Sequence, residues 1–333
     1  MIRYGILGFG HHSGKRLVPA FDRAQHSRLA GLWRRDPEKA MKSAGRFGIE
    51  HIFPSAEELC RSPLIDAIFI TSPDAFHMPD ALLAFRHGKH VLCEKPLAMN
   101  TGEVDRMLVA AHAAGVRFGV AQNFRYNESL RLVRNWVQSG RIGTPRFATA
   151  HFYFQAERSP RAWIDNPSLA CGGSLGDVGI HCIDTLRYVL SQDVSAVSAI
   201  AQSDDHSGGL DTNAVLALDF SGATLGCVMS GFRSHYRSFL EVAGENGTIQ
   251  AENAMDVDHP VEVRLLRGGE TLDNQRVSNA DAYSRMLDAF SAWIEGGGEY
   301  AAPAADGRNN QQALDAAYAS WRSGMRQDIS AAG

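Results

Sequence analysis

Cysteine pairs, basic runs and long apolar stretches are all scarce in this chain of 333 residues. Its five cysteines stand apart with no Cys-x-x-Cys pair, which argues against a zinc ribbon and against a disulfide framework. The formal net charge is -4 and no basic run is longer than Arg34-Arg35, so nucleic acid is not expected as a partner. No apolar stretch approaches the ~20 residues of a membrane-spanning helix, and the N-terminal run is too short for a signal peptide. We therefore expect a soluble cytoplasmic protein without a membrane partner.

The chain is longer than one hydrophobic core usually holds, and its pattern changes once. Apolar strands alternate with helices up to residue 122, which predicts a parallel, doubly wound α/β sheet. Beyond it, alternating strand patterns predict an α+β domain with a large, mostly antiparallel sheet that has one open face. We place the domains at residues 1–122 and 123–333. Two terminal helices are expected over residues 283–295 and 311–324, and the C-terminal helix is expected to pack back on the first domain.

The first apolar run, residues 2–7, leads into a glycine-rich turn, Gly8-Phe9-Gly10-His11-His12-Ser13-Gly14. In the dinucleotide-binding fingerprint, the first glycine makes a tight turn and the second lets the backbone approach a pyrophosphate. The third position lets the helix pack closely on the strand, and here the small Ser13 fills it, with Gly14 just behind. Pro19 is expected to kink the helix that follows. The pattern favours a cofactor turn over a plain glycine-rich loop, and His11 and His12 are expected to shape the cofactor pocket.

The second strand ends in Arg34-Arg35-Asp36-Pro37, where an acidic residue would bind the ribose of NAD or an arginine the 2′-phosphate of NADP. Two arginines occupy this place, and a planar guanidinium binds phosphate bidentately, so we predict NADP(H), with NAD possible because Asp36 is close by. The alternative interpretation is a solvated charged turn.

Polar groups follow three further strands at their carboxyl ends, which in an open α/β sheet face the ligand crevice. The most informative is Lys95, which Pro96 pushes towards an extended conformation; alone, it could equally be a surface lysine after an edge strand. With the glycine turn and the arginines, the predicted cofactor-binding residues at these ends are Thr71, Ser72, Pro73, His77, Glu94, Lys95 and Asn123.

A glycine pair, Gly172-Gly173, precedes a helical pattern that begins at Asp177. Asp177 and His181 stand four residues apart and are therefore expected on one helical face. They could also form a surface pair or half of a metal site, but no third ligand follows at metal-like spacing, so no metal is expected.

In this order, the motifs resemble those of the glucose–fructose oxidoreductase / inositol dehydrogenase family. The family's Gly-x-Gly-x-x-Gly turn corresponds to Gly8 and Gly10 with Ser13 as a departure, its Glu-Lys-Pro motif to residues 94–96, and its later glycine, aspartate and histidine element to residues 172–181. The resemblance implies a Rossmann domain and a domain for substrate binding and oligomerisation. It also implies NAD(P)-dependent oxidation or reduction of sugars, polyols or related compounds, in a homodimer or homotetramer that we expect to form through the C-terminal sheet.

Hydride transfer at a carbinol carbon needs a group that moves the hydroxyl proton. An imidazole, with its ordinary pKa of about 6.5, suits this work, so His181 is the predicted proton-transfer group, supported by Asp177, while Lys95 binds the reacting oxygen. The predicted substrate contacts are Lys95, Arg125, Tyr153, Trp163, Asp177 and His181, although an aromatic residue in a strand is more often part of the core. Two other classes stay open: a cofactor-sensing regulator of the same fold, and a zinc-dependent lyase or hydrolase.

Overall fold

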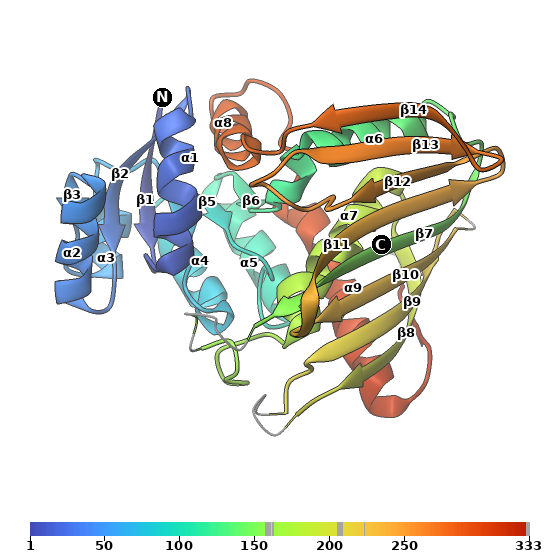
Figure 1. The fold of residues 1–333 in the computed structure, drawn as a ribbon. Helices are drawn as coiled ribbons and strands as arrows, with labels where there is room; N and C mark the ends of the chain where they lie inside the picture. The colour runs from blue at the N-terminus through green and yellow to red at the C-terminus, as the bar shows by residue number, and fades with distance from the viewer. Residues whose placement is uncertain (157–160, 162, 205–208, 223, 331–333) are drawn as a thin grey trace. The chain divides into compact units, whose positions relative to one another are not determined.

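The computed structural model describes residues 1–156, 161, 163–204, 209–222 and 224–330 (Figure 1). The chain forms two compact units, each built from segments that are distant in the sequence. The first consists of Met1–Gln122, Ser168–Cys171 and Tyr283–Arg308, and the second of Asn123–Pro167, Gly172–Ala282 and Asn309–Gly333.

The first unit contains a six-stranded, wholly parallel sheet in the order β3-β2-β1-β4-β5-β6. Its strands are β1 Ile2–Leu7, β2 Ser27–Trp33, β3 His51–Ile52, β4 Ala67–Ile70, β5 His90–Cys93 and β6 Phe118–Val120. The order reverses between β1 and β4, which is the switch point where open α/β sheets bind ligands. The predicted doubly wound sheet is confirmed.

Helices connect these strands, and their ends follow sequence signals. They are η1 Ser13–Leu17, α1 Val18–Arg23, α2 Pro37–Phe47, α3 Ala56–Arg61, η2 Asp74–Phe76, α4 His77–Arg86, α5 Thr101–Ala114 and, from Tyr283 onward, α8 Ala282–Ile294. The α5 helix is typical: the Asn100 side chain accepts the Glu103 N–H at its start, and Gly115 ends it with φ +65°. Side chains such as Ile68, Val91 and Met107 fill the core between sheet and helices.

The sequence predicted that Pro19 kinks the helix after the glycine turn. Residues 11–23 are helical throughout, with the π-helical turn η1 up to Leu17 and α1 from Val18 onward, so Pro19 lies within a continuous helical segment. Proline lacks the N–H that an α-helix would use, and a π-helical turn directly before it is a place where helices bend. The kink stays a prediction.

The second unit is built on a nine-stranded sheet in the order β14-β13-β12-β11-β7-β10-β9-β8-β15. Its strands are β7 Pro145–Gln155, β8 Val194–Gln202, β9 Asn213–Phe220, β10 Leu225–Gly231, β11 Arg233–Gly244, β12 Thr248–Glu252, β13 Val261–Arg267, β14 Glu270–Val277 and β15 Gln327–Asp328. All neighbours are antiparallel except β7 and β10, which run parallel. The predicted mostly antiparallel sheet is confirmed.

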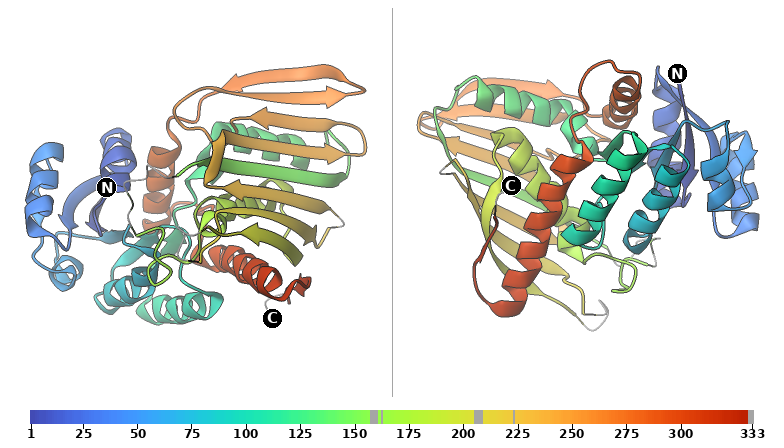
Figure 2. Two further views of the ribbon diagram at one scale, coloured as in Figure 1. Left: turned by 60° about the horizontal axis from the view of Figure 1, so that its bottom comes forward. Right: turned by 180° about the vertical axis from the view of Figure 1, so that it is seen from behind.

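Helices cover one face of this sheet and leave the other open, as Figure 2 shows for α6, α7 and α9. The helical segments are η3 Asn123–Tyr126, α6 Glu128–Gln138, η4 Leu175–Gly179, α7 Ile180–Leu190 and, from Asn309 onward, α9 Ala304–Ser323. Strand residues alternate between the two faces: on β7, Ala148 and Ala150 are buried, whereas Phe147 is 61% exposed.

The helix expected over residues 311–324 in fact begins at Ala304, and a glycine in its first turns packs closely against a strand. A Cβ atom on Gly307 would lie 2.3 Å from Val120 Cγ2 of β6, so the close approach of helix and strand requires glycine there. Glycine is usually a weak helix former, and the sequence therefore indicated a Gly/Ala-rich connection at this position.

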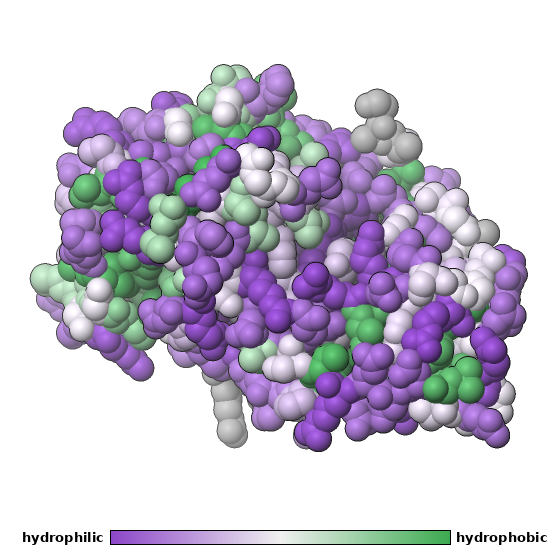
Figure 3. Space-filling view, turned by 90° about the horizontal axis from the view of Figure 1, so that it is seen from above, coloured by the Kyte–Doolittle hydropathy of each residue, from purple (hydrophilic) through white to green (hydrophobic). Residues whose placement is uncertain are grey.

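In the space-filling view of Figure 3, hydrophilic side chains predominate and hydrophobic ones lie in small groups. Among the residues that the structure describes, no helix is both long and apolar enough to cross a membrane.

Candidate active site

The glycine turn after β1 is tight and is held by backbone contacts. Gly8 has φ +89°, and a Cβ atom there would lie 2.6 Å from the backbone nitrogen of Ser72, so only glycine fits. The N–H groups of Gly8 and Phe9 both donate to the carbonyl oxygen of Trp33, at 3.1 and 3.2 Å. Nothing comparable crowds Gly10, where the nearest atom to an added Cβ is 3.7 Å away.

At the place of the third fingerprint glycine, Ser13 makes hydrogen bonds and Gly14 allows close packing. The Ser13 hydroxyl accepts the Gly10 N–H at 3.3 Å and lies 3.0 Å from the Thr71 hydroxyl, so it ties the turn to the end of β4. A Cβ atom on Gly14 would lie 2.8 Å from the Phe47 ring of α2. The close packing expected at Ser13 is therefore made one residue later.

The side chains of the turn point in different directions. The Phe9 ring is buried and lies 5.9 Å from the Phe47 ring, so any contact of Phe9 with a cofactor is limited to its backbone. His11 is exposed, whereas the His12 Nε2 atom lies 3.1 Å from a carboxylate oxygen of Glu94. Burial acts to raise the pKa of Glu94, but attraction to His12 and neighbouring cations outweighs it, so the pKa lies below its ordinary value.

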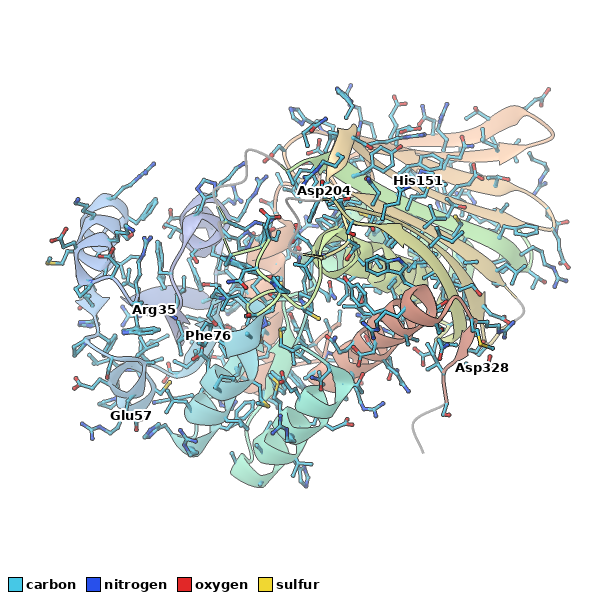
Figure 4. All side chains as sticks on the ribbon, turned by 90° about the horizontal axis from the view of Figure 1, so that it is seen from below. Arg35, Glu57, Phe76, His151, Asp204 and Asp328 are labelled. Atoms are coloured by element: carbon cyan, nitrogen blue, oxygen red, sulfur yellow. The ribbon has the colours of Figure 1, made fainter. Side chains whose placement is uncertain are left out.

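At the end of β2, Asp36 binds Lys39, whereas Arg34 and Arg35 contact other residues. The Asp36 carboxylate caps α2 by accepting the Lys39 N–H at 3.0 Å and pairs with the Lys39 ammonium at 3.2 Å, which lowers its pKa. The Arg34 guanidinium donates to the Ser43 hydroxyl at 3.4 Å. The Arg35 guanidinium lies 5.2 Å from the centre of the Phe76 ring (Figure 4). Neither contact involves the Asp36 carboxylate, and the binding of the 2′-phosphate by the two arginines stays a prediction.

The end of β4 is anchored to α4. The Ser72 hydroxyl donates to Asp80 at 2.7 Å, and burial raises the pKa of Asp80 to about 6. His77 is buried, and both of its ring nitrogens contact backbone carbonyl oxygens, those of Pro96 and Ser72. Thr71 and Pro73 remain partly exposed at this strand end. Of the predicted cofactor-binding residues at this strand end, His77 is the one whose ring nitrogens both contact the protein backbone.

Lys95 follows directly on β5, at the same edge of the parallel sheet as the other strand ends. Its backbone N–H donates to the Glu94 carboxylate at 3.3 Å, and the bond to Pro96 is cis. The side chain is half-buried. The glycine turn, Glu94 and Lys95 therefore all lie in the first unit, at the edge of its sheet where the parallel strands end.

In the second unit, His181 lies in the first turn of α7 among aromatic rings. Its ring centre is 4.4 Å from that of Phe124 and 6.4 Å from that of Phe152. The side chain is 7% exposed, so an imidazole in this place is largely shielded from water. Sequence reasoning did not identify Phe124, because an aromatic residue after a strand carries no distinctive pattern.

Asp177 lies in the π-helical turn η4, which precedes α7, and an arginine that the sequence did not indicate holds its carboxylate. The Arg161 guanidinium donates to both oxygens of Asp177, at 2.9 and 2.7 Å. Such a bidentate pair fixes the orientation of the carboxylate and favours its ionised form. Arg161 precedes the glycine pair by eleven residues, with no periodic signal linking it to Asp177.

The glycine pair before η4 allows close packing. A Cβ atom on Gly172 would lie 1.7 Å from the Tyr318 hydroxyl, and one on Gly173 would lie 1.8 Å from the Asp211 carbonyl oxygen. The buried Asp211 carboxylate accepts from the Gly173 N–H at 3.0 Å, the Leu175 N–H at 2.7 Å, the Ser174 hydroxyl at 2.8 Å and the Tyr318 hydroxyl at 2.6 Å. Asp211 thus anchors the turn that carries Asp177 and His181.

Asp211→Ala is expected to destabilise the protein strongly. The substitution leaves the buried N–H groups of Gly173 and Leu175 and two hydroxyls without their acceptor, at roughly 1–3 kcal/mol for each donor that stays unsatisfied. A melting temperature measured by calorimetry should fall sharply, whereas Asp328→Ala, at an exposed aspartate, should leave it nearly unchanged. Equal melting temperatures for the two variants would contradict the anchoring role.

Asn123 and Arg125, on η3, differ in what they contact. Asn123 is 3% exposed, and its side-chain nitrogen has no hydrogen-bond partner among the described residues, which leaves a buried donor for a ligand. The buried Arg125 guanidinium donates to both oxygens of Asp184 at 3.0 Å, and Asn310 donates to the same carboxylate at 2.6 Å. This buried pair joins η3 to α7 within the second unit, and the contact of Arg125 with a substrate stays a prediction.

Tyr153 lies on the opposite face of β7 from the ring of Phe152, and its contact with a substrate stays a prediction. Side chains alternate along a strand, and the Phe152 ring faces His181, so Tyr153 faces away and stacks 6.3 Å from the ring of His151. Trp163 packs with Phe152 and Val178 in a small cluster on the side of η4. It stays a predicted substrate contact.

Within the described residues, no group of three His, Cys, Asp or Glu side chains could hold a metal ion.

Comparisons with known proteins agree with this geometry. Residues 2–122 match the model of an oxidoreductase family with an NAD-binding Rossmann fold, which defines the class as a dinucleotide-binding oxidoreductase. Residues 130–250 match the GFO/IDH/MocA C-terminal domain. The chain therefore belongs to the Gfo/Idh/MocA family, as the motifs suggested, and it is an enzyme of the oxidoreductase class.

Relatives span several sugar and polyol chemistries. The chain is 30% identical to the 1,5-anhydro-D-fructose reductase of Ensifer adhaerens over 92% of each chain. It is 31% identical to the NADP(+)-dependent scyllo-inositol 2-dehydrogenase of Bacillus subtilis, over 80% of this chain and 81% of that one. Among solved structures, the aldose-aldose oxidoreductase of Caulobacter crescentus, complexed with glycerol, superposes with a TM-score of 0.90 at 26% identity, over 98% of this chain and 99% of that one.

Proposed function

We propose that the protein transfers a hydride between NADP(H) and a sugar, a polyol or a related hydroxy or keto compound. The observation that supports the choice of NADP(H) is the end of β2, where Arg34 and Arg35 follow the strand directly and the Asp36 carboxylate caps α2. The names of the relatives support the substrate class, since they act on an anhydrofructose and on an inositol.

In this proposal, the chain's own residues bind the cofactor and move the proton. The cofactor supplies the hydride when it is bound. The backbone of the turn at Gly8 and Gly10 accommodates the pyrophosphate, and the buried amide of Asn123 offers a hydrogen bond to the cofactor. The Lys95 ammonium donates to the reacting oxygen, and His181 takes or returns the hydroxyl proton.

The experiment that tests this function is a screen of the purified protein with NADP(H) and NAD(H) against a panel of sugars and polyols. Turnover of at least one compound, faster with NADP(H), supports the proposal. Absence of turnover across a broad panel, in protein that binds the dinucleotide, would contradict it.

The cofactor preference has its own prediction. Replacing Arg34 and Arg35 together by alanine should weaken NADP(H) binding by about 1.5–3 kcal/mol for each charge-assisted bond that is lost. NAD(H) affinity should change little, because NAD lacks the phosphate. Titration of the dinucleotides into both proteins measures the effect, and Arg28→Ala, at the exposed N-terminal end of β2, is the matched control. Wild-type protein that binds NAD(H) more tightly than NADP(H) would contradict the assignment.

We also propose that the open sheet face joins copies of the chain in a homodimer or homotetramer. Four large apolar side chains on this face are exposed: Phe147 by 61%, Ile200 by 76%, Val215 by 45% and Leu225 by 53%. Phe147 pairs with Leu225 across β7 and β10, and Val215 with Ile200 across β9 and β8, so they form two apolar pairs.

Phe147→Asp combined with Leu225→Asp should shift the protein towards monomers, because burying two carboxylates at an apolar interface is costly. Light scattering coupled to size-exclusion chromatography measures the mass. Val109→Asp, at an exposed valine of α5, is the control and should keep the wild-type mass. A wild-type protein that is monomeric at high concentration would exclude the assembly.

A further inference from the structure

His77, the first residue of α4, is held on both sides by backbone oxygens. Its Nδ1 atom lies 2.8 Å from the carbonyl oxygen of Pro96, and its Nε2 atom lies 2.9 Å from that of Ser72. The side chain is 1% exposed, so water does not compete for either nitrogen.

Two such contacts require two N–H groups. A carbonyl oxygen only accepts hydrogen bonds, and a neutral imidazole has one N–H, with a lone pair on its other nitrogen. A neutral ring would therefore set a lone pair against an oxygen at hydrogen-bond distance in the protein interior, which is unfavourable. A doubly protonated ring satisfies both contacts.

The charges around His77 suit a cation. The Asp80 carboxylate, which accepts from the Ser72 hydroxyl at 2.7 Å, and the Glu94 carboxylate are both attracted to the His77 ring. Each of these two acids also has other cations near it. Arg35 lowers the pKa of Asp80, and His12 and Lys95 lower the pKa of Glu94. Two carboxylates thus interact electrostatically with the ring.

The two oxygens that His77 joins belong to segments with different tasks. Ser72 lies against the glycine turn, where a Cβ atom on Gly8 would meet the Ser72 nitrogen at 2.6 Å. Pro96 follows Lys95 directly. Because Gly8 is also held by the Trp33 carbonyl oxygen, the turn has a second support, whereas the His77 contact fixes the carbonyl that follows Lys95.

We propose that His77 is a positioning residue whose doubly protonated ring joins Ser72 to Pro96 and thereby fixes the backbone that carries Lys95. It takes no part in contacts with the cofactor, in contrast to its assignment from the sequence. The effect on turnover rests on the proposed role of Lys95, but the protonation of the ring does not.

The protonation is tested by nitrogen NMR on protein that carries isotopically labelled histidine. The two ring signals that disappear in His77→Phe identify the residue. At about pH 8, where an ordinary imidazole is neutral, both nitrogens of His77 should show the chemical shift of a protonated nitrogen. A signal typical of an unprotonated nitrogen would overturn the proposal, and this measurement on the wild-type protein stands even if the variant folds poorly.

The positioning role is tested by a graded pair of variants. His77→Gln keeps one donor and His77→Phe keeps none, so kcat should fall in that order, up to about 100-fold, as expected when a reacting group shifts by about 1 Å. The dissociation constant of NADP(H) should stay close to that of the wild type, and His112→Gln, at an exposed histidine of α5, should change neither quantity.

Folded His77→Gln and His77→Phe with wild-type kcat would overturn the positioning role. If Lys95→Met retained turnover, the proposed role of Lys95 would fail, but the nitrogen signals of His77 would still decide its charge.

Discussion

Lys95→Met is expected to lower kcat by about 100-fold or more, the usual effect of removing a preorganised donor to a developing oxyanion. Methionine keeps the length and apolar stem of lysine, so the change removes the ammonium and little else. Binding of the dinucleotide should survive with a modest loss, because the glycine turn and Glu94 remain. Steady-state kinetics on the best substrate of the panel, with a separate cofactor titration, measures both quantities.

Lys42→Met is the matched control, since Lys42 is exposed on α2. It should retain full activity. If Lys95→Met kept near-normal turnover as well, Lys95 would be a structural residue at the end of its strand, and another donor would have to bind the reacting oxygen.

His181→Ala is expected to lower the rate by about 100- to 10,000-fold, the range for a positioned general base. In the oxidation direction, the wild-type rate should rise with pH, since only the deprotonated ring accepts the proton, and the variant should lack this rise. The His181 ring is buried against Phe124, so alanine also leaves a cavity, and the melting temperature should be recorded alongside.

Two further variants delimit the role of His181. Asp177→Asn should do less damage, because an amide still occupies the place but loses the charge that binds Arg161. His259→Ala, at an exposed histidine, should leave rate and pH profile unchanged. A His181→Ala protein with the wild-type profile would show that the proton travels through another group, with Lys95 or a tyrosine next.

The sequence predicted the order of most elements, because buried strands and helix caps have local signals. Asn100 and Gly115, residues typical of helix ends, bound α5, and the apolar runs before Gly8 and Lys95 are strands. Elements without a local signal could not be predicted from the sequence. β3 has only two residues, and β14 is exposed on nearly its whole length, so neither shows an alternating pattern.

Candidate site residues could be proposed from the sequence where a motif contains them, but contacts between residues distant in the sequence could not. Lys95 and His181 lie in motifs with a fixed spacing. Asp211 and Tyr318, which hold the glycine pair, lie dozens of residues downstream of it, and nothing near Arg161 marks it as the partner of Asp177. At Gly173 and Gly307 the absence of a side chain allows a neighbouring residue to pack closely. In the sequence, such a glycine looks the same as a glycine in a flexible connection.

The place of β7 in its sheet has a consequence for how the protein is made. β7 ends at Gln155, but its neighbours β10 and β11 begin at Leu225 and Arg233. A ribosome that adds roughly 5–20 residues per second needs several seconds to supply the first of these partners. During that time the strand's apolar side chains and its unpaired backbone are open to other chains. The yield of folded protein therefore depends on chaperone capacity and on growth temperature, separately from the stability of the finished fold.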